Sequence, residues 1–165
     1  MKQPLQYTAN NLAIKGYTDS PLAKSETRDC VVRAIASCFD IEYDQAHKFV
    51  KETFSRQNRR GTFNTAQKLV RLVDRNFTLG GKSIHTTGVR NNSSMIGSLR
   101  YDVTVKGKKT KREMTVGKFV QDNPTGTFFM LVRGHAFTIK DGVVIGNPED
   151  AKKLKRVVRC AFLIK

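Results

Sequence analysis

Cys30 and His135 are the two residues whose types and positions predict covalent chemistry. Cys30 follows the helix-capping residue types Thr27 and Asp29 and begins an apolar-rich run with helical spacing. A thiol in the first turn of a helix lies near the partial positive charge of the helix N-terminus, which favours the nucleophilic thiolate. His135 follows Gly134 at the start of a strand-like run. An imidazole that reaches the sulfur can take its proton and later protonate a leaving group.

A cysteine–histidine pair also needs a third group that holds the ring. Asn147 follows His135 by one predicted hairpin, and its side-chain carbonyl can accept a hydrogen bond from the imidazole. Asp141 is closer in sequence, but it forms a two-residue turn with Gly142 and is expected to serve that turn. We therefore expect a catalytic set of Cys30, His135 and Asn147, with Asp141 as the alternative orienting residue. Backbone amides at the helix start, including that of Cys30, are expected to form part of an oxyanion hole.

The remaining cysteines and histidines are predicted to have no catalytic role. Cys38 and Cys160 lie in apolar helical and strand-like runs and are expected to be small buried residues. The three cysteines show no CxxC or Cys/His zinc spacing, so we predict no metal site, no cofactor and no disulfide. His47 lies one position off the apolar stripe of a predicted helix and is expected to be half-exposed, and His85 is assigned to the surface.

The positive charge is the unusual bulk property of this chain. Thirty Lys and Arg against fourteen Asp and Glu give a net charge of +16. Such a charge favours polyanionic partners, namely DNA, RNA or an acidic protein surface, or it serves solubility alone. No apolar run is long enough to span a membrane, and residues 1–6 contain no apolar signal core. We therefore expect no membrane association and a cytoplasmic location.

Periodicity predicts an α+β fold in one domain over residues 1–165, with N-terminal helices packed on a C-terminal antiparallel sheet. Residues 1–24 are expected to form an N-terminal arm with one short strand around 12–17, and residues 29–75 a helical half. Residues 76–112 are expected to be a loop-rich insertion, and residues 113–165 a helix plus the sheet. The predicted helices cover 29–39, 44–56, 64–74 and 115–121, and the predicted strands cover 83–86, 101–105, 127–132, 135–140, 143–145 and 156–164.

A short segment of the insertion is strongly basic. Lys106, Lys108, Lys109, Lys111 and Arg112 fall within seven residues. The favoured interpretation is the solvated tip of a hairpin, and the functional alternative is a finger that contacts nucleic-acid phosphates. In that alternative, residues 56–60 and 152–159 would converge with it on one basic face.

The order of these motifs resembles papain-like cysteine peptidases, and more closely a group of small phage and bacterial proteins with that fold. The similar stretches are Asp29–Ala36, Thr115–Val120, Asn123–Gly126, Arg133–Ala136 and Asp141–Val144. With the helix over 44–56 and the turn at residues 60–62, the similarity covers about two-thirds of the chain. The resemblance implies a main helix starting at Cys30 that packs on an antiparallel sheet. It also implies Cys30 as nucleophile, His135 as base and an acyl-enzyme.

Two positions depart from the pattern of these peptidases. Papain-like enzymes usually place a Gln about six residues before the cysteine to complete the oxyanion hole, and here that position is Lys24. In the small relatives the third residue tends to be an Asp near the end of the strand after the hairpin. Gly146 and Asn147 occupy that place in this chain. The second oxyanion donor is therefore unidentified, and the competence of the site stays open.

Two hypotheses follow from the sequence. The leading one is a small papain-like thiol hydrolase, a phage-type peptidase that acts on a peptide or protein substrate in a host cytoplasm. The alternative is a non-enzymatic basic protein on the same fold, which binds nucleic acid or a host protein or belongs to a virion. The sequence does not predict the cleaved bond or the oligomeric state.

Overall fold

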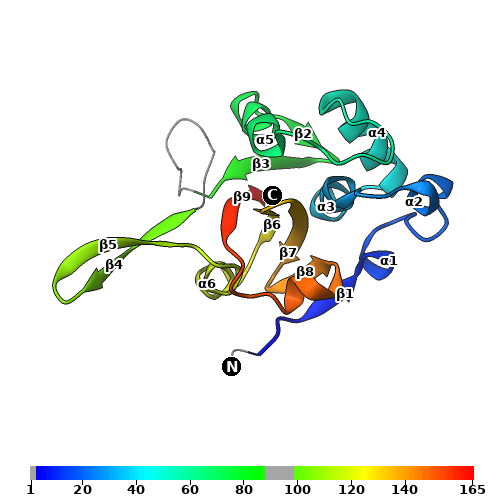
Figure 1. The fold of residues 1–165 in the computed structure, drawn as a ribbon. Coiled ribbons are helices and arrows are strands. Elements are labelled where there is room, and N and C mark those ends of the chain that lie inside the picture. Colours follow the sequence, from blue (N-terminus) through cyan, green and yellow to red (C-terminus); the bar gives the residue numbers. More distant parts are fainter. Residues whose placement is uncertain (1–2, 88–98) are drawn as a thin grey trace.

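A mixed seven-stranded sheet forms the centre of the computed structural model, which describes residues 3–87 and 99–165 (Figure 1). The strand order is β1-β8-β7-β6-β9-β3-β2. Neighbouring strands are antiparallel except β1 and β8, which run parallel. The strands are β1 (Tyr7–Ala9), β2 (Thr78–Leu79), β3 (Lys82–Thr86), β6 (Thr127–Val132), β7 (His135–Lys140), β8 (Val143–Gly146) and β9 (Val158–Ile164).

Helices cover both faces of this sheet, which confirms the α+β class expected from the sequence. Figure 1 shows α3, α4 and α5 on one side and α6 on the other. The helices are α1 (Asn10–Ala13), α2 (Pro21–Ser25), α3 (Cys30–Phe39), α4 (Tyr43–Thr53), α5 (Thr65–Asp74), α6 (Val116–Asp122) and the 3-10 turn η1 (Pro148–Ala151). Within the described ranges, no helix has the length and apolar character needed to cross a membrane.

The alternation of side chains along β6 divides the apolar core into two layers. Phe129 packs in the layer that contains α3, α4 and α5, whereas Phe128 and Met130 pack in the layer that contains α6. Successive side chains of a strand point to opposite faces, so a continuous apolar run marks a strand buried on both sides. The central position of β6, between β7 and β9, follows from this run.

Helix α3 is the most deeply buried helix and crosses the central strands. Its face of Val31, Ala34, Ile35 and Cys38, expected from the periodicity, is buried. Burial of a large aliphatic side chain such as Ile35 stabilises the fold by about 1.5–3 kcal/mol. A buried hydroxyl also ties α3 to β7, because Thr138 Oγ1 bonds the main-chain oxygen of Ala34 at 3.3 Å. The N-terminus of α3 is thereby fixed at one end of β7.

The first and third segments of the chain differ from the sequence predictions. The prediction of a short strand around residues 12–17 is wrong. The strand of this segment is instead β1, which pairs with β8 at the edge of the sheet. The insertion over residues 76–112 is less loop-rich than expected, because it contains β2 and β3 and a two-stranded hairpin. Part of it, residues 88–98, lies outside the described residues.

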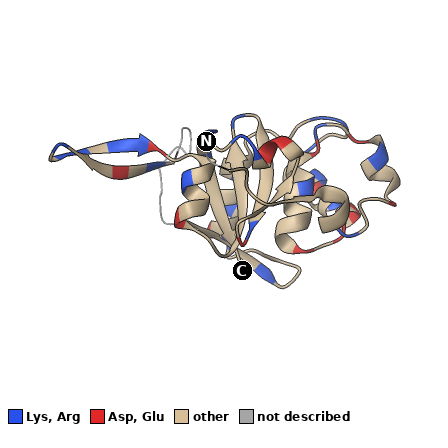
Figure 2. Ribbon diagram, turned by 90° about the horizontal axis from the view of Figure 1, so that it is seen from below, with Lys and Arg blue, Asp and Glu red and all other residues tan. Residues whose placement is uncertain are grey.

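The hairpin of β4 (Arg100–Val105) and β5 (Lys108–Glu113) projects away from the body of the molecule (Figures 1 and 2). All residues of β5 are exposed. The predicted strand at 101–105 is confirmed, and the basic segment 106–112 lies in an exposed hairpin as favoured. Only residues 106 and 107 form its tip, because residues 108–112 belong to β5.

Gly146 at the end of β8 is needed for close packing. A Cβ at this position would lie 2.6 Å from Asp150 Oδ2 and 3.0 Å from Phe137 Cβ. Such contacts force the neighbouring groups apart, and overpacking of this kind costs about 1–3 kcal/mol.

We therefore expect Gly146→Ala to lower the free energy of unfolding by about 1–3 kcal/mol in urea titrations. Gly61→Ala is the matched control, because a Cβ at Gly61 meets nothing within 4 Å. Equal stability of the two variants would contradict the packing of Gly146 against Asp150.

Candidate active site

Cys30 is the first residue of α3, and its thiol is half-buried. The preceding Asp29 does not cap the helix with its side chain. Its carboxylate instead accepts hydrogen bonds from Arg33 Nε at 3.1 Å and from the Tyr43 hydroxyl at 2.7 Å. These bonds fix the backbone directly before the nucleophile without covering the helix N-terminus.

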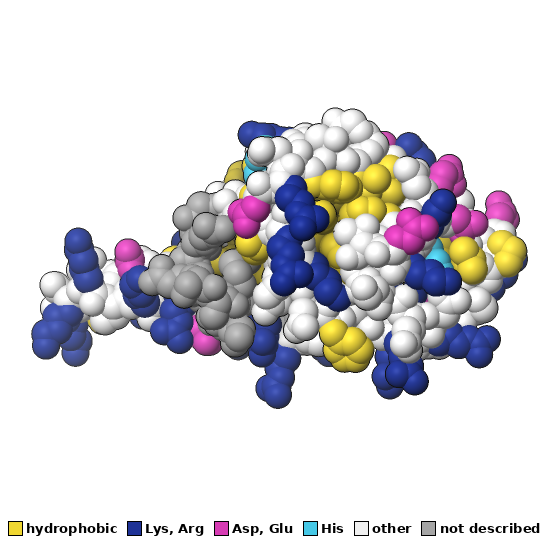
Figure 3. All heavy atoms as spheres, turned by 90° about the horizontal axis from the view of Figure 1, so that it is seen from above, with side chains coloured by type: hydrophobic (Ala, Val, Ile, Leu, Met, Phe, Trp, Pro, Cys, Tyr) yellow, Lys and Arg dark blue, Asp and Glu magenta, His cyan; other side chains and the backbone are white. Residues whose placement is uncertain are grey.

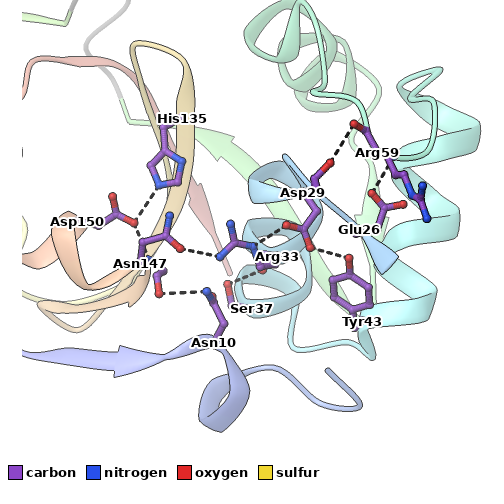
Figure 4. A network of polar contacts seen from close by, with 12 residues as sticks. Asn10, Glu26, Asp29, Arg33, Ser37, Tyr43, Arg59, His135, Asn147 and Asp150 are labelled. Carbon is purple, nitrogen blue, oxygen red and sulfur yellow. Dashed lines mark hydrogen bonds and ion pairs between the residues drawn. The ribbon is translucent and has the colours of Figure 1, made fainter. Parts of the chain in front are cut away.

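The His135 ring bonds the buried carboxylate of Asp150 (Figure 4) and lines the same groove as Cys30. His135 Nε2 lies 2.9 Å from Asp150 Oδ2. The ring is also close enough to the Cys30 side chain that each group shifts the pKa of the other. The imidazole stacks on Phe137, with ring centroids 5.9 Å apart. Because Nε2 is engaged by Asp150, Nδ1 is the nitrogen left to exchange a proton with the sulfur. The ring orientation suits a general base for Cys30.

The electrostatics of this pair favour a thiolate. Burial alone would raise the pKa of Cys30, but the hydrogen bonds from His135 and the Ala136 backbone, with the charges of His135 and Arg33, lower it below the ordinary value. The other two cysteines show the opposite behaviour. Burial raises the pKa of Cys38 and of Cys160 to about 12. Cys30 is thus the one thiol among the three that its surroundings activate.

The imidazole is correspondingly held in its protonated form. Burial would lower the pKa of His135, but the interactions of the ring with the acceptors Asp150 and Cys30, and the negative charges of these groups, raise it to about 9. A thiolate beside an imidazolium is the reactive form of a cysteine–histidine pair at neutral pH.

Asp150 is almost completely buried, at 2% exposure, and makes three polar contacts. Besides His135, its carboxylate accepts hydrogen bonds from the Asn147 backbone amide at 2.8 Å and from Arg156 Nη1 at 3.1 Å. Burial would raise the pKa of Asp150, but His135, the Asn147 amide and Arg156 lower it. The carboxylate therefore stays charged and can hold the imidazolium.

Asn147 lies in the site, but its side chain serves another purpose than the one expected. Asn147 Oδ1 accepts a hydrogen bond from Arg33 Nη1 at 2.9 Å, and the residue forms a capping box with Asp150 over η1. Figure 4 shows Asn147 between Asp150 and Arg33. Asp150, and not Asn147, accepts the hydrogen bond of the His135 ring, because the capping box turns the Asp150 carboxylate back toward β7. Asp141 lies in its turn as expected, with a positive φ, and its Oδ1 accepts a hydrogen bond from the Gly126 amide before β6 at 2.8 Å.

The sequence analysis missed Asp150, although a signal for it was present. Asn147 and Asp150 are separated by three positions, with Pro148 between them. A cap residue, a proline at the first helical position and an acid at the third are together typical of a helix start. That pattern predicts a carboxylate that folds back onto the backbone of residue 147.

A groove with a volume of about 860 Å³ opens beside the pair. Its walls are the start of α3, residues 61–67, the β6–β7 turn and part of β9, and it includes Cys30, His135 and Asn147. Lys24 is not among its lining residues, and neither are Lys106, Lys108, Lys109, Lys111 and Arg112. The structure thus brings the predicted catalytic residues together and places the basic hairpin residues elsewhere.

His47 is a correction to the sequence analysis. It is buried rather than half-exposed, with Nε2 2.8 Å from Glu26 Oε1. Arg56 bonds the same carboxylate at 2.6 Å. Both contacts hold Glu26, which lies in the segment that leads to Cys30. Within the described ranges, no group of three or more His, Cys, Asp or Glu side chains is arranged to hold a metal ion.

Comparisons of the chain with protein-family models, with curated proteins and with solved structures found no match.

We expect Asp150→Asn to lower the pKa of His135 from about 9 toward the ordinary value of 6.5. The variant keeps the shape of the side chain but removes the charge that favours the imidazolium. An NMR titration of the ring measures this pKa directly. Asp122→Asn, which removes a half-exposed carboxylate paired with Lys118, is the control.

The raised pKa of His135 also makes the stability of the fold depend on pH. Because the pKa of His135 is raised in the folded state, its stabilising contribution is complete below about 6.5 and is lost as the pH rises to about 9. The free energy of unfolding of the wild type should fall across this window by more than that of Asp150→Asn. A fall of equal size in both proteins would contradict the ion pair.

Proposed function

We propose that the protein is a papain-like cysteine hydrolase that cleaves a peptide or isopeptide bond through an acyl-enzyme. The observation that carries this proposal is the arrangement of Cys30 and His135 on one groove, with Asp150 bonded to the ring at 2.9 Å. A lowered thiol pKa accompanies a raised imidazole pKa in this arrangement. A nucleophile, its base and a group that orients the base are the three parts that such chemistry requires.

The placement of these parts supports the papain-like assignment. The cysteine begins a buried helix, the histidine begins a strand of the adjoining sheet, and the acid follows the next strand. This is the chain order that the resemblance implies, with Asp150 in the orienting role. The N-terminal arm adds β1 to the edge of the sheet beside β8, which is an elaboration that the sequence did not predict.

The chemistry follows from the geometry of the pair. The Cys30 thiolate attacks the substrate carbonyl carbon, and the developing oxyanion lies near the backbone amide at the start of α3. The His135 imidazolium then donates its proton to the leaving nitrogen as the carbon–nitrogen bond breaks. The neutral ring, held by Asp150, takes a proton from water, whose oxygen attacks the thioester and restores the free cysteine.

We expect Cys30→Ala to abolish hydrolysis and His135→Ala to lower kcat/KM by about 10²–10⁴, measured with a library of quenched fluorescent peptides. Asp150→Asn should lower kcat by more than Asn147→Ala does, because Asp150 bonds the ring and Asn147 bonds Arg33. Asp141→Asn, at the turn, should leave kcat unchanged. Cleavage that persists in Cys30→Ala would refute the proposal.

A second candidate function is nucleic-acid binding through the projecting hairpin. Lys106, Lys108, Lys109, Lys111 and Arg112 lie on β5 or on the turn before it, outside the body of the molecule. The wider basic face is not supported, because Arg56 is buried and paired with Glu26. A two-stranded ribbon with exposed cations is of a size that enters a major groove.

We expect replacement of these five hairpin residues by Gln to weaken binding to duplex DNA and to flatten the dependence of affinity on salt concentration. Fluorescence anisotropy across a salt series measures both effects. The control is Lys48→Gln with Lys51→Gln, which removes exposed cations from α4. No binding of the wild type at low salt would refute this second function.

A further inference from the structure

The charged residues that line the groove beside Cys30 are all basic, apart from the catalytic pair. Arg28, Arg33 and Arg159 border it, and none of its lining residues is Asp or Glu. Arg33 is neutralised, because its guanidinium bonds the Asp29 carboxylate at 3.1 Å. Arg28 and Arg159 are exposed, and among the described residues neither is paired with an acid. Two cations without partners therefore face the space that a substrate would occupy.

Arg28 and Arg159 each lie where the backbone is irregular. Arg28 has a φ of +54°, in the left-handed region that an arginine rarely adopts. Arg159 lies where the register between β6 and β9 shifts, since Leu131 pairs with Cys160 and Val132 pairs with Val158. Arg159 is thus the unpaired residue of a β-bulge, a feature that redirects a side chain. Strained or irregular backbone of this kind occurs often beside functional sites.

The sheet register gives the spacing between Arg159 and the catalytic histidine. His135 pairs with Val132 on β6, and Val132 pairs with Val158 on β9, directly before Arg159. Adjacent strands lie about 4.8 Å apart, so two strand spacings amount to roughly 10 Å. An extended peptide advances about 3.3 Å per residue. For a substrate that runs across β7, β6 and β9, this backbone span therefore corresponds to about three residues.

We propose that the groove selects acidic peptides and binds a Glu or Asp about three residues from the scissile bond through Arg159, with Arg28 adding positive charge beside the nucleophile. This inference rests on the proposed hydrolase function. A guanidinium matches a carboxylate with two parallel hydrogen bonds, which fixes both position and orientation. Figure 3 shows that Lys and Arg also predominate over Asp and Glu across one outer face. With a net charge of +16, the molecule as a whole attracts acidic chains.

The electrostatic potential in the groove is measured by comparing the rates at which iodoacetate and iodoacetamide alkylate Cys30. In both reactions the sulfur forms a bond to the methylene carbon and iodide leaves, but only iodoacetate carries a negative charge. The ratio of the two second-order rates is insensitive to the fraction of thiolate, because both reagents need the same thiolate. The full chain is used in the wild type, in Arg28→Gln, in Arg159→Gln and in the double variant.

We expect the iodoacetate-to-iodoacetamide ratio to fall about twofold to threefold in each single variant and about fivefold in the double variant at low salt. Lys140→Gln is the matched control, because Lys140 is exposed at the opposite end of β7, roughly 17 Å along the strand from His135. That variant should keep the wild-type ratio. The same ratio in the double variant and the wild type would overturn the inference.

This experiment separates the inference from the function on which it rests. Slow alkylation of Cys30 by both reagents, at the rate of an ordinary thiol, would overturn the hydrolase proposal while the ratio still reports the two arginines. With an active enzyme, peptides that carry one Glu at successive positions test the spacing. The Glu that raises kcat/KM should lie about three residues from the cleaved bond, and Arg159→Gln should remove its advantage. An advantage that Arg159→Gln leaves intact would overturn the role of Arg159.

Discussion

The hydrogen bond between His135 and the buried carboxylate of Asp150 is the interaction on which the site depends. It fixes the ring through Nε2, leaves Nδ1 available to the sulfur and, together with Cys30, raises the pKa of the imidazole to about 9. A buried carboxylate is costly unless it is satisfied, and Asp150 is satisfied by His135, Arg156 and the Asn147 amide. The lack of a side chain at Gly146 leaves the space in which this carboxylate lies. The end of β8 and the turn η1 are therefore parts of the site, although neither contacts the thiol.

A second series of contacts holds the helix start against this turn. Arg33 bonds Asp29 on one side and Asn147 on the other, and Tyr43 bonds the second oxygen of Asp29 (Figure 4). The residue before the nucleophile is thus connected to the residue that caps η1. Because the cysteine and the ring come from separate halves of the chain, a rigid connection of this kind keeps them in register. The bond expected between Asn147 and the ring is replaced by this structural link between the two halves.

Much of the fold could be predicted from the sequence, because local rules determine it. The helix starting at Cys30, the strands on either side of Gly134 and the turn at residues 141–142 follow from periodicity and turn chemistry. The structure places Cys30 and His135 on one groove, as these elements suggested, and each shifts the pKa of the other. The parallel pairing of β1 with β8 could not be predicted, since it joins residues far apart in sequence. A 3-10 turn of four residues has no periodicity, so the only signal for Asp150 was the cap pattern of Asn147, Pro148 and an acid at the third position. The burial of His47 depends on Glu26, a partner from another segment.

The most direct measurement of the central claim is the alkylation rate of Cys30 by iodoacetamide as a function of pH, in the wild type and in His135→Ala. An ion pair predicts that the wild-type thiolate persists below the ordinary thiol pKa of about 8.5. In His135→Ala the rate should instead follow the profile of an ordinary thiol. A wild-type rate that rises only through the ordinary thiol range, and that His135→Ala leaves unchanged, would contradict the account.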